Sequence, residues 1–183
     1  GKINWVSMDP PLRETMLVRG DVDAITGFYF TSLLNLNARG VKDEDVVILP
    51  YPQFGVKHYG NAIIASEKLV KEKPEVVKAF LRAFTRGVKE VLADPNAAVK
   101  FVKARDPIID EPLELRRLKL AIEGSIATSD ARSEGFGEIR EPRLALMVSQ
   151  VNDAFGLKER LDPGRIFNSS LLPPKAERNI FSK

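Results

Sequence analysis

The clearest periodic pattern in the chain lies between residues 74 and 93. Apolar residues recur there at the three- and four-residue spacing that defines one face of a helix: Val77, Phe80, Leu81, Phe84, Val88, Val91 and Leu92. Pro74 suits the first turn of such a helix, because its missing N–H has no partner to satisfy there. The pattern predicts a long amphipathic helix that ends before Asp94 and Pro95.

Four short apolar runs come earlier in the chain, at residues 3–6, 22–26, 46–49 and 60–65. Each is bounded by glycine, proline or polar residues, which is typical of buried strands. Two helical patterns separate the first three runs, and they end at Gly20 and Gly40. Because this βαβαβ alternation characterises parallel sheets, we predict an α/β fold with a parallel-sheet front.

The remainder of the chain reads as helix. Residues 51–58 contain two prolines and a glycine, and we expect them to connect the front to a helical back. Acid–proline pairs open helical patterns after residues 94, 110 and 141. Residues 133–139 are expected to form a loop, and Asp162 and Pro163 a turn.

Composition narrows the classes of function. The 183 residues are 44% apolar, enough for one core or two small ones. The net charge of +3 comes from dispersed residues, which gives no basic patch for nucleic acid. The chain has no cysteine, so a thiol nucleophile, a cysteine-type zinc site and disulfides are excluded. No run of 18 apolar residues is present. Because the first six residues already resemble a strand, we expect further residues upstream.

Catalytic candidates are few. His58 is the only histidine, so the sequence offers neither a pair of histidine ligands nor a triad with a spare base. Asp9, Asp94 and Asp162 each precede a proline at the start of an element, and we interpret them as helix caps. No glycine-rich phosphate loop is present. We therefore expect neither catalysis nor a bound cofactor or metal.

Binding is the better-supported interpretation. In parallel sheets, ligands collect beyond the carboxyl ends of the strands. Six of the chain's 14 aromatic residues fall within residues 28–59. Ser7, Phe30 and Gln53 are neighbours in the chain of the residues predicted here to bind a ligand. The ligand-binding residues predicted in this way are Met8, Asp9, Phe28, Tyr29, Tyr51, Phe54, His58, Tyr59 and Asn61.

Four motifs together resemble the solute-binding proteins of ABC importers. They are RGDVDA at residues 19–24, YGNAIIAS at 59–66, KPEVVKAFLRA at 73–83 and DPNAA at 94–98. The chain is most similar to the branch that binds thiamine-pyrimidine precursors, nitrate, sulfonates and taurine. The resemblance implies a two-lobed type II periplasmic-binding-protein architecture, of which this chain is a C-terminal portion. Residues 1–56 would be the latter part of the second lobe, and residues 57–183 the returning part of the first.

The same resemblance implies a function. A small planar or anionic solute would be held between two closing lobes, outside the cytoplasm, and delivered to a membrane permease and its ATPase. A portion of such a protein would expose sheet edges and an apolar face, and it would associate with another copy of itself or with the missing part. Two alternatives remain open: an intracellular pyrimidine-biosynthesis enzyme of similar fold, and a ligand-sensing module. The enzyme relative uses an active-site histidine and an iron-binding cysteine cluster, and the lack of cysteine counts against it.

Overall fold

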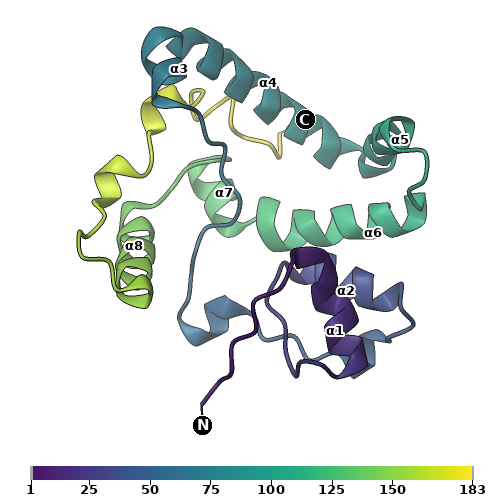
Figure 1. The fold of residues 1–183 in the computed structure, drawn as a ribbon. Helices are drawn as coiled ribbons and strands as arrows, with labels where there is room; N and C mark the ends of the chain where they lie inside the picture. The colour runs from purple at the N-terminus through teal and green to yellow at the C-terminus, as the bar shows by residue number, and fades with distance from the viewer. Residues whose placement is uncertain (1, 183) are drawn as a thin grey trace.

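The computed structural model describes residues 2–182, and the regular structure in these residues is helical (Figure 1). The α-helices are α1 (Arg13–Arg19), α2 (Tyr29–Asn37), α3 (Glu67–Glu72), α4 (Pro74–Ala93), α5 (Pro95–Arg105), α6 (Glu111–Ala121), α7 (Ser129–Glu134) and α8 (Glu141–Phe155). Short helical turns are η1 (Pro10–Leu12), η2 (Asp43–Asp45), η3 (Tyr51–Phe54), η5 (Pro163–Arg165) and η6 (Ser169–Leu171). A π turn, η4 (Ile122–Ile126), extends α6. No helix in residues 2–182 has the length and apolar character needed to cross a membrane.

The predicted α/β fold is wrong. Residues 3–6, 22–26, 46–49 and 60–65 contain no strand in the described structure, so neither the parallel sheet nor the type II two-lobed architecture is present. Apolar alternation marks a segment that could become a strand, but a strand forms only when a second segment supplies its hydrogen bonds. These runs instead have no regular hydrogen-bonded structure, and parts of them are open to solvent, with Val47 84% and Ile64 91% exposed.

The helix predictions are confirmed where local signals defined them. α4 spans Pro74–Ala93, and α1 ends at Gly20, whose φ of 76° is costly for any residue with a β-carbon. The side chain of Asp94 accepts a hydrogen bond from the N–H of Ala97, and Asp162 does the same for Gly164. Asp9 does occupy the N-cap position of η1, but its side chain makes no capping hydrogen bond there.

The helices pack as a chain of neighbours around small apolar contacts. α6 lies between α5 and α2, α1 packs on α2, and the C-terminal tail runs beside α4 (Figure 1). Leu34 and Ile180 are the largest side chains that are fully buried. The division of the chain at residue 56 stays a prediction.

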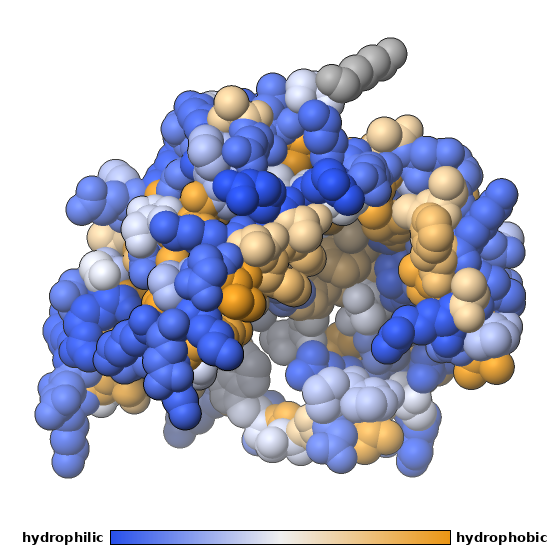
Figure 2. All heavy atoms as spheres, turned by 90° about the horizontal axis from the view of Figure 1, so that it is seen from above, coloured by the Kyte–Doolittle hydropathy of each residue, from blue (hydrophilic) through white to orange (hydrophobic). Residues whose placement is uncertain are grey.

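Only part of the predicted apolar stripe of α4 is covered. Val77 is buried, whereas Phe80 is 54% exposed and Phe84 is also open to solvent. The two rings stack with their centroids 6.2 Å apart, and Phe84 continues the stack to Phe136 at 6.3 Å. Figure 2 shows hydrophobic side chains open to solvent in the middle of the face seen from above.

The C-terminal tail is held by a buried arginine. Arg178 is 6% exposed and donates to the carbonyl oxygens of Pro173, Glu134 and Phe136. Its Nη2 also pairs with Glu138 Oε2 at 2.8 Å. Because the guanidinium has five donors in a rigid fork, one side chain can satisfy several acceptors from separate segments. Arg178 thereby joins the tail to the loop after α7.

Candidate functional site

Residues 51–61, here called the connector, are tied by their backbone to α8. Arg143 donates from Nε to the carbonyl oxygen of Lys57 at 2.8 Å and from Nη2 to that of His58 at 2.9 Å. About two turns further along the same helix, Gln150 Nε2 donates to the carbonyl oxygen of Gly55 at 3.1 Å. Three connector carbonyls that would otherwise need water are therefore satisfied by α8.

Tyr59 is fixed at both its ring and its hydroxyl. The guanidinium carbon of Arg143 lies 4.0 Å from the ring centroid, a cation–π contact. The hydroxyl oxygen accepts a hydrogen bond from the backbone N–H of Arg140 at 2.8 Å. The ring consequently stands in one orientation between the connector and the start of α8.

Two acidic residues orient the arginines around Tyr59. Asp130 of α7 pairs with Arg143 at 2.8 Å and with Arg140 at 3.3 Å. Glu134 pairs with Arg140 at 3.3 Å. Arg143 is thus engaged through Nε, Nη1 and Nη2, whereas the side chain of Arg140 remains half exposed. Of the two cations, Arg140 is the one that faces solvent.

His58 is held by an amide. Its Nε2 lies 3.1 Å from Gln150 Oε1, and its side chain is half-buried. A catalytic imidazole is normally oriented by a carboxylate and paired with a nucleophile, and the described contacts of His58 include neither. Within residues 2–182, no group of three or more histidine, cysteine or acidic side chains could hold a metal ion.

An aromatic group at the start of α2 lies next to the connector. Phe28 stacks on Phe30 with centroids 5.3 Å apart, and Tyr29 meets Phe30 edge-on at 5.7 Å. A β-carbon placed on Gly60 would lie 4.0 Å from Phe28 Cε1, so the Phe28 ring is in van der Waals range of the connector. Phe28 therefore lies beside the residue that follows Tyr59, although the two are about thirty positions apart in the chain.

Tyr29 has an anchoring position. Its hydroxyl donates to the carbonyl oxygen of Leu120 at 3.0 Å, which joins α2 to α6. Burial raises the pKa of Tyr29 above its ordinary value of 10.0, and the negative charge of Glu123 adds to the rise. Since its hydroxyl already has a protein partner, Tyr29 contributes to the site by placing Phe28 and Phe30.

The other predicted residues are not joined to this group. Tyr51 and Phe54 are exposed in η3, which Gly55 closes with a φ of 84°. Met8 is half-buried, and Asp9 and Asn61 are exposed. The described side-chain hydrogen bonds and ring contacts include none of the five. Of the nine predicted residues, Phe28 lies beside Gly60 of the connector, Tyr29 packs on Phe30, and His58 and Tyr59 are held by residues 140–150.

The sequence analysis missed the residues that organise the site. They lie on α7, on α8 and at the N-cap of α8, far along the chain from the connector: Asp130, Arg140, Arg143 and Gln150. In the sequence these are polar positions on amphipathic helices, and nothing in the helical period distinguishes them from solvated ones. Only the fold reveals their partners.

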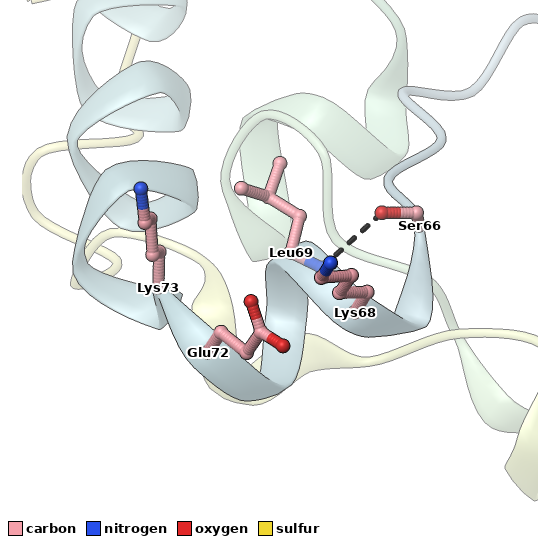
Figure 3. Close-up of a pocket in the computed structure, with 5 residues that line it drawn as sticks. All are labelled: Ser66, Lys68, Leu69, Glu72 and Lys73. Carbon is pink, nitrogen blue, oxygen red and sulfur yellow. Dashed lines mark hydrogen bonds between the residues drawn. The ribbon is translucent and has the colours of Figure 1, made fainter.

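A separate hollow lies at the start of α3. It has a volume of about 370 Å³ and is lined by Ser66, Lys68, Leu69, Glu72 and Lys73. Figure 3 shows that the hydroxyl of Ser66 is occupied, since it accepts a hydrogen bond from the N–H of Leu69 at 3.2 Å. None of the nine predicted residues lines this hollow.

Comparison with known proteins gives one family. The family model described as NMT1/THI5 like matches residues 2–98. This range covers more than half of the chain and contains all nine predicted binding residues. No curated protein and no solved structure gives a match to the chain.

Proposed function

Because the chain belongs to the NMT1/THI5-like family, we propose that it is a solute-binding component of a bacterial ABC importer. The observation that carries the proposal is the family match, which spans the connector and the start of α2. The resemblance of residues 19–24, 59–66, 73–83 and 94–98 to importer binding proteins supports the same class. The protein would work outside the cytoplasm and pass its solute to a permease and its ATPase.

The surface around Tyr59 is the proposed binding site. The exposed ring of Phe28 would pack on a planar or apolar part of the solute, since aromatic faces favour flat partners. Arg140, whose side chain is half exposed, would pair with an anionic group on the same solute. Tyr59 and Arg143 would hold these two groups in place through their stacked contact.

The chemistry of this surface favours binding over catalysis. The single histidine is held by Gln150, and the arginines near it are paired with Asp130 and Glu134. These groups orient and neutralise charge, but none of them is an activated nucleophile. The proposal therefore assigns the protein no reaction.

A thermal-shift screen of the purified chain tests the proposal. The probes are pyrimidines, sulfonates, nitrate and aromatic carboxylates, each added separately. A ligand present at 100 times its dissociation constant stabilises the folded state by about 2.7 kcal/mol, which raises the melting temperature measurably. We expect a shift with one chemical class. A folded sample that shifts with none of them contradicts the proposed function.

Variants then test the position of the site. Phe28→Ala and Arg140→Ala are expected to weaken binding of the positive probe in isothermal titration calorimetry. Phe155→Ala is the matched control, because Phe155 is an exposed phenylalanine near the end of α8. Unchanged affinity in both site variants would place the solute elsewhere on the protein.

A further inference from the structure

The chain exposes much more surface than a compact protein of its mass. Its accessible area is 13474 Å². A folded monomer of 20.4 kDa exposes about 8,800 Å². The excess of about 4,700 Å² is larger than the 1,000–2,500 Å² or so that each subunit buries in an obligate homodimer. The molecule therefore has ample surface for a permanent interface with a partner.

A well-defined part of this surface lies on α4. Phe80, Phe84, Gly87 and Val91 follow the spacing i, i+4, i+7 and i+11, which places them on one face. This face is adjacent to the one that Val77 and Thr85 bury against the rest of the chain. Below, it is called the α4 face. Val76, one turn before Phe80, extends it and is also exposed.

The α4 face carries both a projection and a hollow. Phe80 is the projection, being 54% exposed. The hollow has a volume of about 350 Å³ and is lined by Phe84, Gly87, Val88, Val91, Leu92 and Ile126. A β-carbon on Gly87 would meet nothing within 4 Å, so the absence of a side chain at residue 87 leaves this space open. Glycine inside a helix lowers helix stability by about 1 kcal/mol relative to alanine, so α4 is less stable for having the hollow at Gly87.

We propose that a second copy of this chain covers the α4 face, with two α4 helices packed antiparallel about a two-fold axis. In the alignment that places Phe80 over Gly87 of the other copy, Phe84 meets Ala83 and Val76 meets Val91. Two of these pairs set a phenylalanine against a small residue, which favours interdigitation, and the third sets valine against valine. The two-fold axis produces every pair twice, so the surface is complementary to itself.

Light scattering after size-exclusion chromatography tests whether the dimer exists, and α4 variants test where it forms. The purified chain is expected to have the mass of a dimer. Gly87→Leu places a side chain at the hollow, its β-carbon would meet nothing within 4 Å, and leucine favours the helix. It and Phe80→Ala should each raise the dimer dissociation constant at least about tenfold, as the loss of an interface anchor does. Phe101→Ala, at a 79% exposed phenylalanine on α5, should leave it unchanged.

Because the chain has no cysteine, disulfide trapping can test the alignment itself. Residues 80 and 87 of one helix are about 10.5 Å apart along the axis, too far for a bond within a chain. The double variant Phe80→Cys with Gly87→Cys is expected to give a covalent dimer on oxidation. Neither single variant should form a covalent dimer, because this alignment keeps the one cysteine of each copy away from the same cysteine of the other copy.

Three results would overturn the proposal. The first is a chain that runs as a monomer. The second is an assembly that Gly87→Leu and Phe80→Ala leave unchanged. The third is a Gly87→Cys single variant that crosslinks as well as the double variant. None of these measurements depends on a solute, so they can fail independently of the proposed binding function.

Discussion

Tyr29 lies so close to Gly124 that a β-carbon on the glycine would stand 2.6 Å from the tyrosine hydroxyl oxygen and 2.9 Å from its ring. The contact joins the start of α2 to the π turn that follows α6. It positions the same hydroxyl to donate to Leu120. The aromatic group beside the connector therefore depends on a glycine almost one hundred residues away in the sequence.

We predict that Gly124→Ala destabilises the protein. Overpacking costs about 1–3 kcal/mol, and the better helix propensity of alanine offsets up to about 1 kcal/mol of this. The net loss should be about 1–2 kcal/mol in urea unfolding followed by circular dichroism. Gly60→Ala is the control, because its β-carbon would meet only Phe28 at 4.0 Å.

The double variant Tyr29→Ala with Gly124→Ala identifies the cause. Once the ring is gone, the alanine at residue 124 has no clash, so the second change should cost nothing. If the double variant instead loses as much unfolding free energy as the two single variants added together, the Tyr29–Gly124 contact is not responsible.

Replacement of Arg178 should loosen the C-terminal tail. Arg178→Ala leaves Glu138 and three carbonyl groups without their donor, and we expect a loss of about 2–4 kcal/mol in unfolding free energy. Arg178→Lys keeps the charge but not the forked geometry, so its unfolding free energy should fall nearly as much as that of Arg178→Ala. Arg160→Ala removes an exposed ion pair with Asp153 and should change stability by less than about 1 kcal/mol. Equal effects for Arg178→Ala and Arg160→Ala would contradict the anchoring role.

Asp43 should make stability depend on pH in the acid range. The side-chain hydrogen bond from Asn37, followed by Arg116, holds the pKa of Asp43 below its ordinary value of 3.8. A carboxyl group with a lowered pKa stabilises the folded state above its unfolded pKa, and the contribution disappears as the pH falls through the folded pKa. The melting temperature of wild type should exceed that of Asp43→Asn near pH 6, which is about two units above the ordinary pKa of 3.8. The two curves should converge in strong acid, and a constant difference at all pH values would contradict the assignment.

Tyr29 should produce the opposite dependence in the alkaline range. Its raised pKa favours the neutral hydroxyl in the folded state, so its contribution is present below about pH 10 and is lost as the pH rises through the folded pKa. In an ultraviolet titration, Tyr29 should ionise late, above its ordinary pKa of 10.0. Tyr29→Phe should remove that late step.

Arg143 should control the mobility of the connector. Arg143→Ala removes two hydrogen bonds to the connector backbone and the stack on Tyr59, and we expect faster amide hydrogen exchange at residues 55–61. A double-mutant cycle with Tyr59→Leu should give a coupling energy of about 0.5–1 kcal/mol, typical of an exposed cation–π pair. Arg165→Ala, on the exposed turn η5, is the control. If amide hydrogen exchange at residues 55–61 is unchanged in Arg143→Ala, the Arg143 contacts do not hold the connector.

Local signals in the sequence were sufficient for several helices, although residues 133 and 134, predicted as loop, form the end of α7. Pro74 and the spacing of residues 77–92 predict α4, and Gly20 and Gly156 end α1 and α8 with positive φ angles. The strand predictions failed for residues 3–6, 22–26, 46–49 and 60–65. A helix satisfies its hydrogen bonds within its own segment, whereas a strand depends on a partner that the local pattern cannot supply.

For the candidate site, the sequence by itself determined the aromatic and polar residues of the connector and of the start of α2, because their types cluster within residues 28–61. Only the tertiary structure decided which of them lie together. Arg143 stacks on Tyr59, Gln150 holds His58, and Gly60 passes beside Phe28. These contacts join residues that are about 30 to 90 positions apart, so they follow from how the helices pack and leave no periodic trace in the chain.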